Sequence, residues 1–91
     1  MTRAETIREY LSEYSPDAIL FNGLDDALVG TTSTWPSRNI VAVYDRDACV
    51  RVFMEEGIGW VEAEEYMCFN VEGAYFGKHT PLLISFHEER V

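Results

Sequence analysis

The sequence is poor in basic residues. Seven lysines and arginines stand against sixteen aspartates and glutamates, which gives a formal net charge of −9. No Lys or Arg lies between Arg51 and Lys78, and this interval carries six glutamates: Glu55, Glu56, Glu62, Glu64, Glu65 and Glu72. A surface of this sign repels phosphate backbones and anionic lipids, so we expect no direct binding to nucleic acids or membranes. It attracts a protein with a basic surface, although carboxylates can also simply keep a small protein soluble.

Cysteines and long apolar runs are scarce as well. Two cysteines, Cys49 and Cys68, make no disulfide framework, and their apolar neighbours predict that both thiols are buried. No apolar run approaches the ~20 residues that span a membrane. The first residues also lack the apolar core of a signal peptide. We therefore expect a soluble, cytoplasmic protein.

Motifs of catalysis and cofactor binding are absent from the sequence. The cysteines do not combine with His79 and His87 in any zinc spacing. There is no Gly-x-Ser-x-Gly elbow and no phosphate-binding glycine loop. The sequence thus predicts no metal and no cofactor.

What is present is enough apolar surface for one folded unit. Hydrophobic residues make up 47% of the 91 residues and aromatic residues 13%, which is too much for a disordered chain. This length fits a single domain over residues 1–91, with no room for a second core. A domain so small has modest stability unless it forms a homo-oligomer, which the sequence leaves open.

Hydrophobic periodicity and turn residues predict the elements of this domain. Helices are expected over 3–14, 46–56 and 60–72, and strands over 18–21, 27–34, 40–44 and 81–87. Thr2 and Glu5 have the spacing of a capping box, Asp45 can cap the second helix, and Gly57 can end it. The predicted fold class is therefore α+β, in the order α-β-β-β-α-α-β. It has a small, mainly antiparallel sheet with helices packed on one face.

The core is expected to combine three apolar stripes. Two come from the second and third helices and one from the last strand: Cys49, Val52 and Phe53; Trp60, Ala63, Met67 and Val71; and Leu82, Ile84 and Phe86.

The stretch FNVEGAYFGKHTP, residues 69–81, is the least like simple packing. Gly73 is expected to end the third helix, and Thr80 and Pro81 to lead into the last strand. Asn70 is a poor helix former near the end of the apolar stripe. We expect it to be buried and hydrogen-bonded to a neighbouring loop.

Loop carboxylates suggest one catalytic alternative. Asp25, Asp26 and Asp45 could converge near Asn70 and Thr80 and form a metal-assisted hydrolase. The simpler interpretation of these aspartates is turn formation and helix capping.

The segments DDALVG (25–30), VAVYD (41–45) and 62–84 together resemble a family of small hypothetical proteins of bacteria and their phages. That family carries an Asp-Asp/Glu-Ala…Gly strand, a Tyr-Asp helix start and a Phe-Asn-x-x-Gly-Ala-x-x-Gly-x-x-Thr-Pro segment. The resemblance implies a bacterial or infected host cell as the location, and it implies no known activity. It also suggests that one site is formed by Asp25, Asp26, Asn70, Gly77, Thr80 and Pro81.

The sequence favours a non-enzymatic, acidic protein-binding module over the hydrolase. Aromatic rings next to carboxylates supply both anchoring area and charge steering towards a basic partner. The expected interaction residues are Glu62, Glu64, Glu65, Tyr66, Tyr75 and Phe76, with Trp60 assigned to the core. A partner that handles nucleic acid in a host cell, such as a defence protein, fits the sign of the charge.

Overall fold

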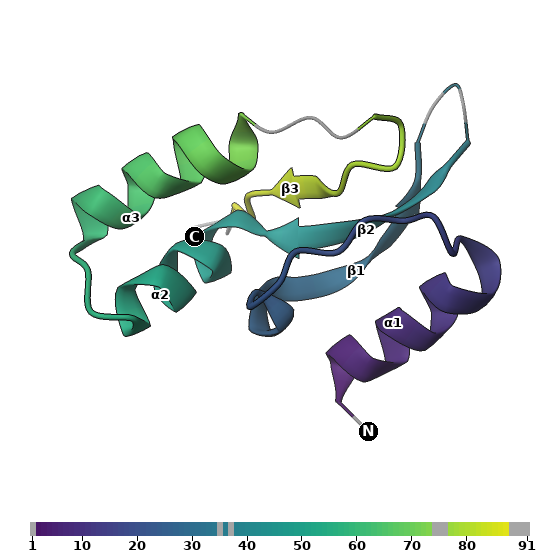
Figure 1. Ribbon diagram of the computed structural model, residues 1–91, viewed down its shortest axis with the longest axis horizontal. Helices are drawn as coiled ribbons and strands as arrows, with labels where there is room; N and C mark the ends of the chain where they lie inside the picture. The colour runs from purple at the N-terminus through teal and green to yellow at the C-terminus, as the bar shows by residue number, and fades with distance from the viewer. Residues whose placement is uncertain (1, 35, 37, 74–76, 88–91) are drawn as a thin grey trace.

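The computed structural model describes residues 2–34, 36, 38–73 and 77–87. It has an α+β fold with a three-stranded sheet, in the order α-β-β-α-α-β (Figure 1). The elements are α1 (Arg3–Tyr14), the 3-10 turn η1 (Asp25–Ala27), β1 (Leu28–Ser33), β2 (Ile40–Asp45), α2 (Arg46–Glu55), α3 (Trp60–Tyr66), the π-helix η2 (Met67–Glu72) and β3 (Leu82–Ile84). The predicted fold class is confirmed.

Local signals fix the ends of the first two helices. The Thr2 hydroxyl accepts a hydrogen bond from the Glu5 amide at 3.2 Å, as its capping position predicts. The Asp45 carboxylate accepts from the amides of Asp47 and Ala48 and so caps α2. Gly57 follows α2 with a φ of +105°, a backbone conformation that residues other than glycine rarely adopt.

The sheet has the order β1-β2-β3 and is mixed. β1 and β2 are antiparallel, as the short connection between them predicts, with Leu28 opposite Tyr44 and Ser33 opposite Ile40. β2 and β3 are parallel over a shorter register, from Val43 opposite Leu82 to Asp45 opposite Ile84. β3 can pair in parallel with β2 because the connection between them, which contains α2, α3 and η2, is long enough to return the chain to the end of the sheet where β2 begins.

The helices share one face of this sheet. Ala42 and Tyr44 of β2 belong to the same buried cluster as residues from every helix: Ile7, Leu11, Cys49, Val50, Ala63, Met67 and Val71. Side chains alternate along a strand, so Val41 and Val43 point to the opposite face, and they lie outside this cluster although both are buried. In Figure 1, α2 and α3 lie side by side at one end of the sheet and α1 at the other.

The prediction of a strand over 18–21 is wrong. This segment forms no ladder and crosses the core face as an irregular connector. The Ile19 amide donates to the His79 carbonyl at 3.2 Å, and the Phe21 amide donates to the Tyr44 hydroxyl at 2.9 Å. Its apolar side chains pack against the core, and these two amides find hydrogen-bond acceptors, although the segment pairs with no neighbouring strand.

The last strand presents the opposite face from the one predicted. Leu83 packs against the core cluster, whereas Leu82, Ile84 and Phe86 are exposed by 42%, 36% and 59%. Tyr44 faces the helices and is the register partner of Leu83, which sets this orientation.

The third predicted helix is also interrupted. It runs as α3 to Tyr66 and continues as the π-helix η2, in which the Gly73 amide donates to the Cys68 carbonyl at 3.1 Å. Ala63, Met67 and Val71 are buried as expected. Trp60 is 59% exposed, contrary to its prediction as core, because it begins α3 one turn before the buried stripe. Cys68 is exposed as well, while Cys49 is buried as predicted.

Candidate protein-binding surface

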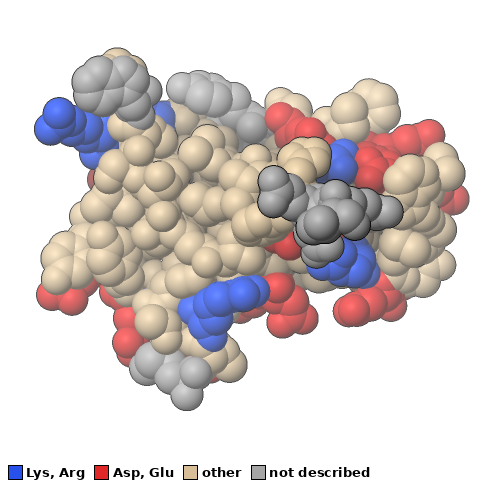
Figure 2. All heavy atoms as spheres, turned by 180° about the vertical axis from the view of Figure 1, so that it is seen from behind, with Lys and Arg blue, Asp and Glu red and all other residues tan. Residues whose placement is uncertain are grey.

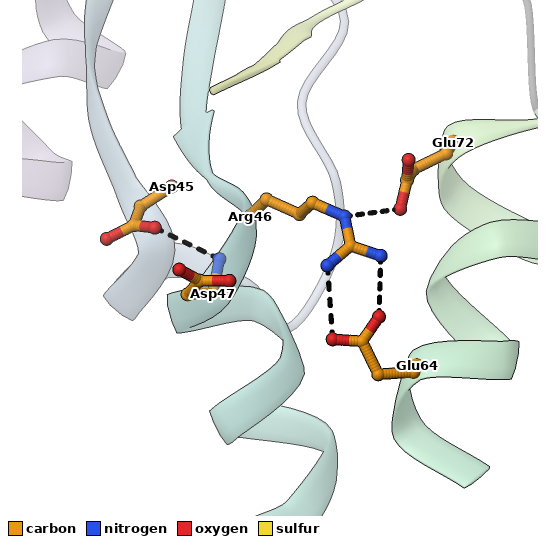
Figure 3. Close-up of polar contacts among 5 residues, drawn as sticks. All are labelled: Asp45, Arg46, Asp47, Glu64 and Glu72. Carbon is orange, nitrogen blue, oxygen red and sulfur yellow. Dashed lines mark hydrogen bonds and ion pairs between the residues drawn. The ribbon is translucent and has the colours of Figure 1, made fainter. Parts of the chain in front are cut away.

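A network of ion pairs joins α2 to α3 and η2. The guanidinium of Arg46, in the first turn of α2, donates to both Glu64 carboxylate oxygens at 3.2 and 2.7 Å (Figure 3). Its Nε donates to the Glu72 carboxylate at 2.6 Å. The hydrogen bond from Arg46 holds the pKa of Glu64 below its usual range. Glu64, expected to face a partner, is therefore already paired within the molecule.

The other two predicted carboxylates of α3 face solvent. Glu62 and Glu65 are exposed, and within the described part of the chain neither pairs with a Lys or Arg. They lie three residues apart on the side of α3 away from buried Ala63. In Figure 2, which views the molecule from behind, carboxylates surround uncharged side chains at the end formed by α2 and α3. Glu62 and Glu65 are thus the free negative charges of this surface.

Large apolar side chains are exposed beside these carboxylates. Val61 is 62% exposed and Phe69 is 77% exposed, and each lies four residues from Glu65 in the sequence. Trp60 adds a third exposed side chain at the start of α3. We call the set of Val61, Glu62, Glu65 and Phe69 the α3–η2 surface. Exposed apolar groups rimmed by charge are typical of protein-binding sites.

Two of these residues were missed by the sequence interpretation. Neither Val61 nor Phe69 was among the expected interaction residues. On a helical wheel, Val61 and Phe69 fall on the side opposite the predicted core residues Ala63 and Met67, so the sequence could have indicated that both are exposed. Tyr66, a predicted anchor, is 48% exposed, but its ring packs on Phe53 of α2 with a centroid distance of 4.7 Å. The other predicted anchors, Tyr75 and Phe76, lie outside the described residues.

The second predicted cluster is divided between the two ends of the sheet. Asp25 and Asp26 lie in η1, directly before β1, and Asp25 pairs with Arg8 of α1. Together they line a hollow of about 400 Å³ with Thr2, Arg3, Ala4 and Glu5. Gly77, Thr80 and Pro81 precede β3 and approach the sheet from the end at which β2 begins (Figure 1).

Contacts within the second group are local. The Thr80 hydroxyl donates to the Gly77 carbonyl at 2.6 Å, and Gly77 has a φ of +92°, so these two residues form a turn. Pro81 is buried next to it. Asn70 is exposed on η2, so the prediction of a buried, loop-pinning amide is wrong.

A metal centre finds no support in these positions. Asp45 caps α2, and the described residues contain no group of three or more His, Cys, Asp or Glu side chains that could hold a metal ion. Nothing in the placement of Asp25, Asp26, Asn70 and Thr80 favours the hydrolase alternative.

Comparisons of the chain with family models, with curated proteins and with solved structures found no match. The resemblance to small bacterial and phage proteins accordingly stays a prediction. Among the residues that the structure describes, no helix has the length and apolar character needed to cross a membrane.

Proposed function

We propose that this chain is a small acidic, non-enzymatic protein-binding module that binds a basic protein through the α3–η2 surface. The observation that carries the proposal is the exposure of Phe69 and Val61 beside Glu65, which has no cationic partner in the described part of the chain. Burial of such apolar side chains provides affinity, and the carboxylates speed and orient the encounter.

The charge of the whole chain supports the same choice of partner. A net charge of −9 produces a long-range field that attracts a basic surface and repels an acidic one. Proteins that hold nucleic acid expose such basic surfaces, because their grooves must neutralise phosphates. A nucleic-acid-handling protein of a bacterial host is therefore the partner class that we favour, and a phage origin of the chain would suit this role.

Affinity capture from a bacterial lysate tests the proposal. The wild-type protein is expected to capture a basic protein, and Glu62→Lys/Glu65→Lys is expected to lose it. The matched control is Glu9→Lys/Glu13→Lys, which makes the same change in charge on exposed positions of α1. Glu64 is left intact because its substitution would break the ion pair with Arg46.

The control separates a specific surface from a general charge effect. Loss of the partner in the α3 variant alone supports the proposal. Equal capture by both variants, or equal loss from both, contradicts it, because binding then depends on another surface or only on net charge. Capture should also weaken as the salt concentration rises, since the contributing charges are solvent-exposed.

A further inference from the structure

The ring of Phe69 is exposed and packs on no other ring among the described residues. Tyr10 packs on Tyr14 with a centroid distance of 4.8 Å, and Tyr66 packs on Phe53. Within the described part of the chain, Phe69 is the most exposed of the large hydrophobic side chains. Trp60 and Phe86 are also exposed without a ring partner there, but neither lies one helical turn from Glu62 or Glu65. The face of the Phe69 ring is thus available to a partner.

Carboxylates flank this ring at helical spacing. Glu65 precedes Phe69 by four residues, and Glu62 lies one turn further towards the start of α3. The opposite side of the same helix already binds an arginine, because Glu64 and Glu72 enclose the guanidinium of Arg46. Of the four carboxylates of α3 and η2, Glu64 and Glu72 pair with Arg46, and Glu62 and Glu65 remain without a cation in the described part of the chain.

We propose that the outward face of α3 and η2 takes an arginine side chain of the partner, stacked on Phe69 and paired with Glu65 and Glu62. This inference rests on the proposed protein-binding function and adds the chemistry of the contact. A guanidinium is planar and weakly hydrated, so it can stack on a ring while its edge donates to a carboxylate. The ammonium of lysine is compact and strongly hydrated and gains less from such a site.

The test compares two peptides of equal charge. Acetylated, amidated Gly-Arg-Gly-Arg-Gly-Arg-Gly and its lysine counterpart are titrated into ¹⁵N-labelled protein, and amide shifts are followed by NMR. The arginine peptide is expected to shift the amides of residues 61–69 and to bind about two- to fivefold more tightly than the lysine peptide. Both peptides should weaken with Glu62→Gln/Glu65→Gln and keep their affinity with Glu9→Gln/Glu13→Gln.

Two substitutions at one position isolate the ring. Phe69→Leu keeps apolar area but removes the π system. The ratio of the affinity for the arginine peptide to that for the lysine peptide is therefore expected to fall to about one. Phe69→Tyr keeps the ring and is expected to retain the preference. Because position 69 is largely exposed, both variants should show the amide dispersion of the wild type.

The outcomes separate this inference from the function on which it rests. Equal binding of the two peptides, an arginine preference that survives Phe69→Leu, or shifts centred away from 61–69 would overturn the arginine site. Capture of a protein partner that is lost with Glu62→Lys/Glu65→Lys would still stand in that case. Failure of both the peptide titration and the capture experiment would refute both proposals.

Discussion

Arg46 and Glu64 form a bidentate ion pair that holds α3 against the first turn of α2. The two carboxylate oxygens of Glu64 accept from separate guanidinium nitrogens, and Glu72 accepts from the third. The Arg46 side chain is 22% exposed, so solvent screens this contact less than it screens a fully exposed pair. The same contact positions the helix that presents Phe69 and Glu65, and it therefore links stability to the proposed binding surface.

Replacing Arg46 with methionine should loosen this end of the molecule. Methionine retains an unbranched apolar side chain but leaves Glu64 and Glu72 without their cation, so we expect a melting temperature lower by a few degrees at neutral pH. Arg51→Met is the matched control, since Arg51 lies in the same helix, is exposed and makes no ion pair within the described residues. Thermal unfolding followed by circular dichroism measures both variants, and an equal loss in both would contradict the role of the Arg46 contacts.

The stabilisation from this pair should depend on pH in a defined direction. The contact with Arg46 lowers the pKa of Glu64 in the folded state, so folding favours the ionised carboxylate. Its contribution is complete above the pKa of an unfolded glutamate, about 4.3, and is lost as the pH falls through the lower folded pKa. The difference in melting temperature between wild type and Arg46→Met should therefore shrink below about pH 4. A difference that stays constant down to pH 3 would refute this assignment.

The two thiols should react at very different rates. Burial, assisted by the nearby Asp45 carboxylate, raises the pKa of Cys49 to about 11, whereas the Cys68 side chain lies on the exposed side of η2. At pH 8 we expect a thiol-specific chromogenic disulfide to modify Cys68 quickly and Cys49 only on unfolding. Cys68→Ser should abolish the fast phase and leave the slow one. A fast phase that persists in this variant would show that Cys49 is accessible.

Backbone conformation after α2 gives a matched pair of glycine substitutions. Gly57 and Gly30 both have open space where a Cβ would be added, but only Gly57 has a positive φ. Gly57→Ala is therefore expected to destabilise the protein by about 1–2 kcal/mol, through backbone strain alone. Gly30→Ala should be neutral or slightly stabilising. Urea unfolding measures both, and equal effects would argue against a left-handed conformation at residue 57.

Features that depend on a few neighbouring residues could be predicted from the sequence. The caps at Thr2 and Asp45 and the stop at Gly57 are set by side chains and backbone preferences within one turn. The antiparallel pairing of β1 and β2 followed from their short connection. These local rules were sufficient for the α+β class and for the buried positions Cys49, Ala63, Met67 and Val71 of the helices.

Features set by distant contacts could not be predicted. The 18–21 segment resembles a strand, but its amides are satisfied by the Tyr44 hydroxyl and the His79 carbonyl, which are remote in sequence. In the α3–η2 surface, the acidic residues were recognised from composition. The exposure of Trp60 and the pairing of Glu64 with Arg46 depend on how α3 docks on α2. Side-chain volume and charge at one position carry no information about that docking.

The orientation of β3 gives the sharpest remaining test, because both of its faces are apolar in sequence. Leu83 packs against the core cluster, while Leu82 and Ile84 are partly exposed on the other face. Leu83→Thr should cost about 2 kcal/mol, since it removes apolar contacts and places a hydroxyl against the core. Leu82→Thr and Ile84→Thr should each cost less than about 1 kcal/mol, because threonine suits a strand and its hydroxyl can reach water. Urea denaturation of the three variants gives the order directly. If Leu82→Thr and Ile84→Thr proved the more damaging, the strand would face the helices through the side that periodicity alone suggested, and the register of Leu83 beside Tyr44 would be wrong.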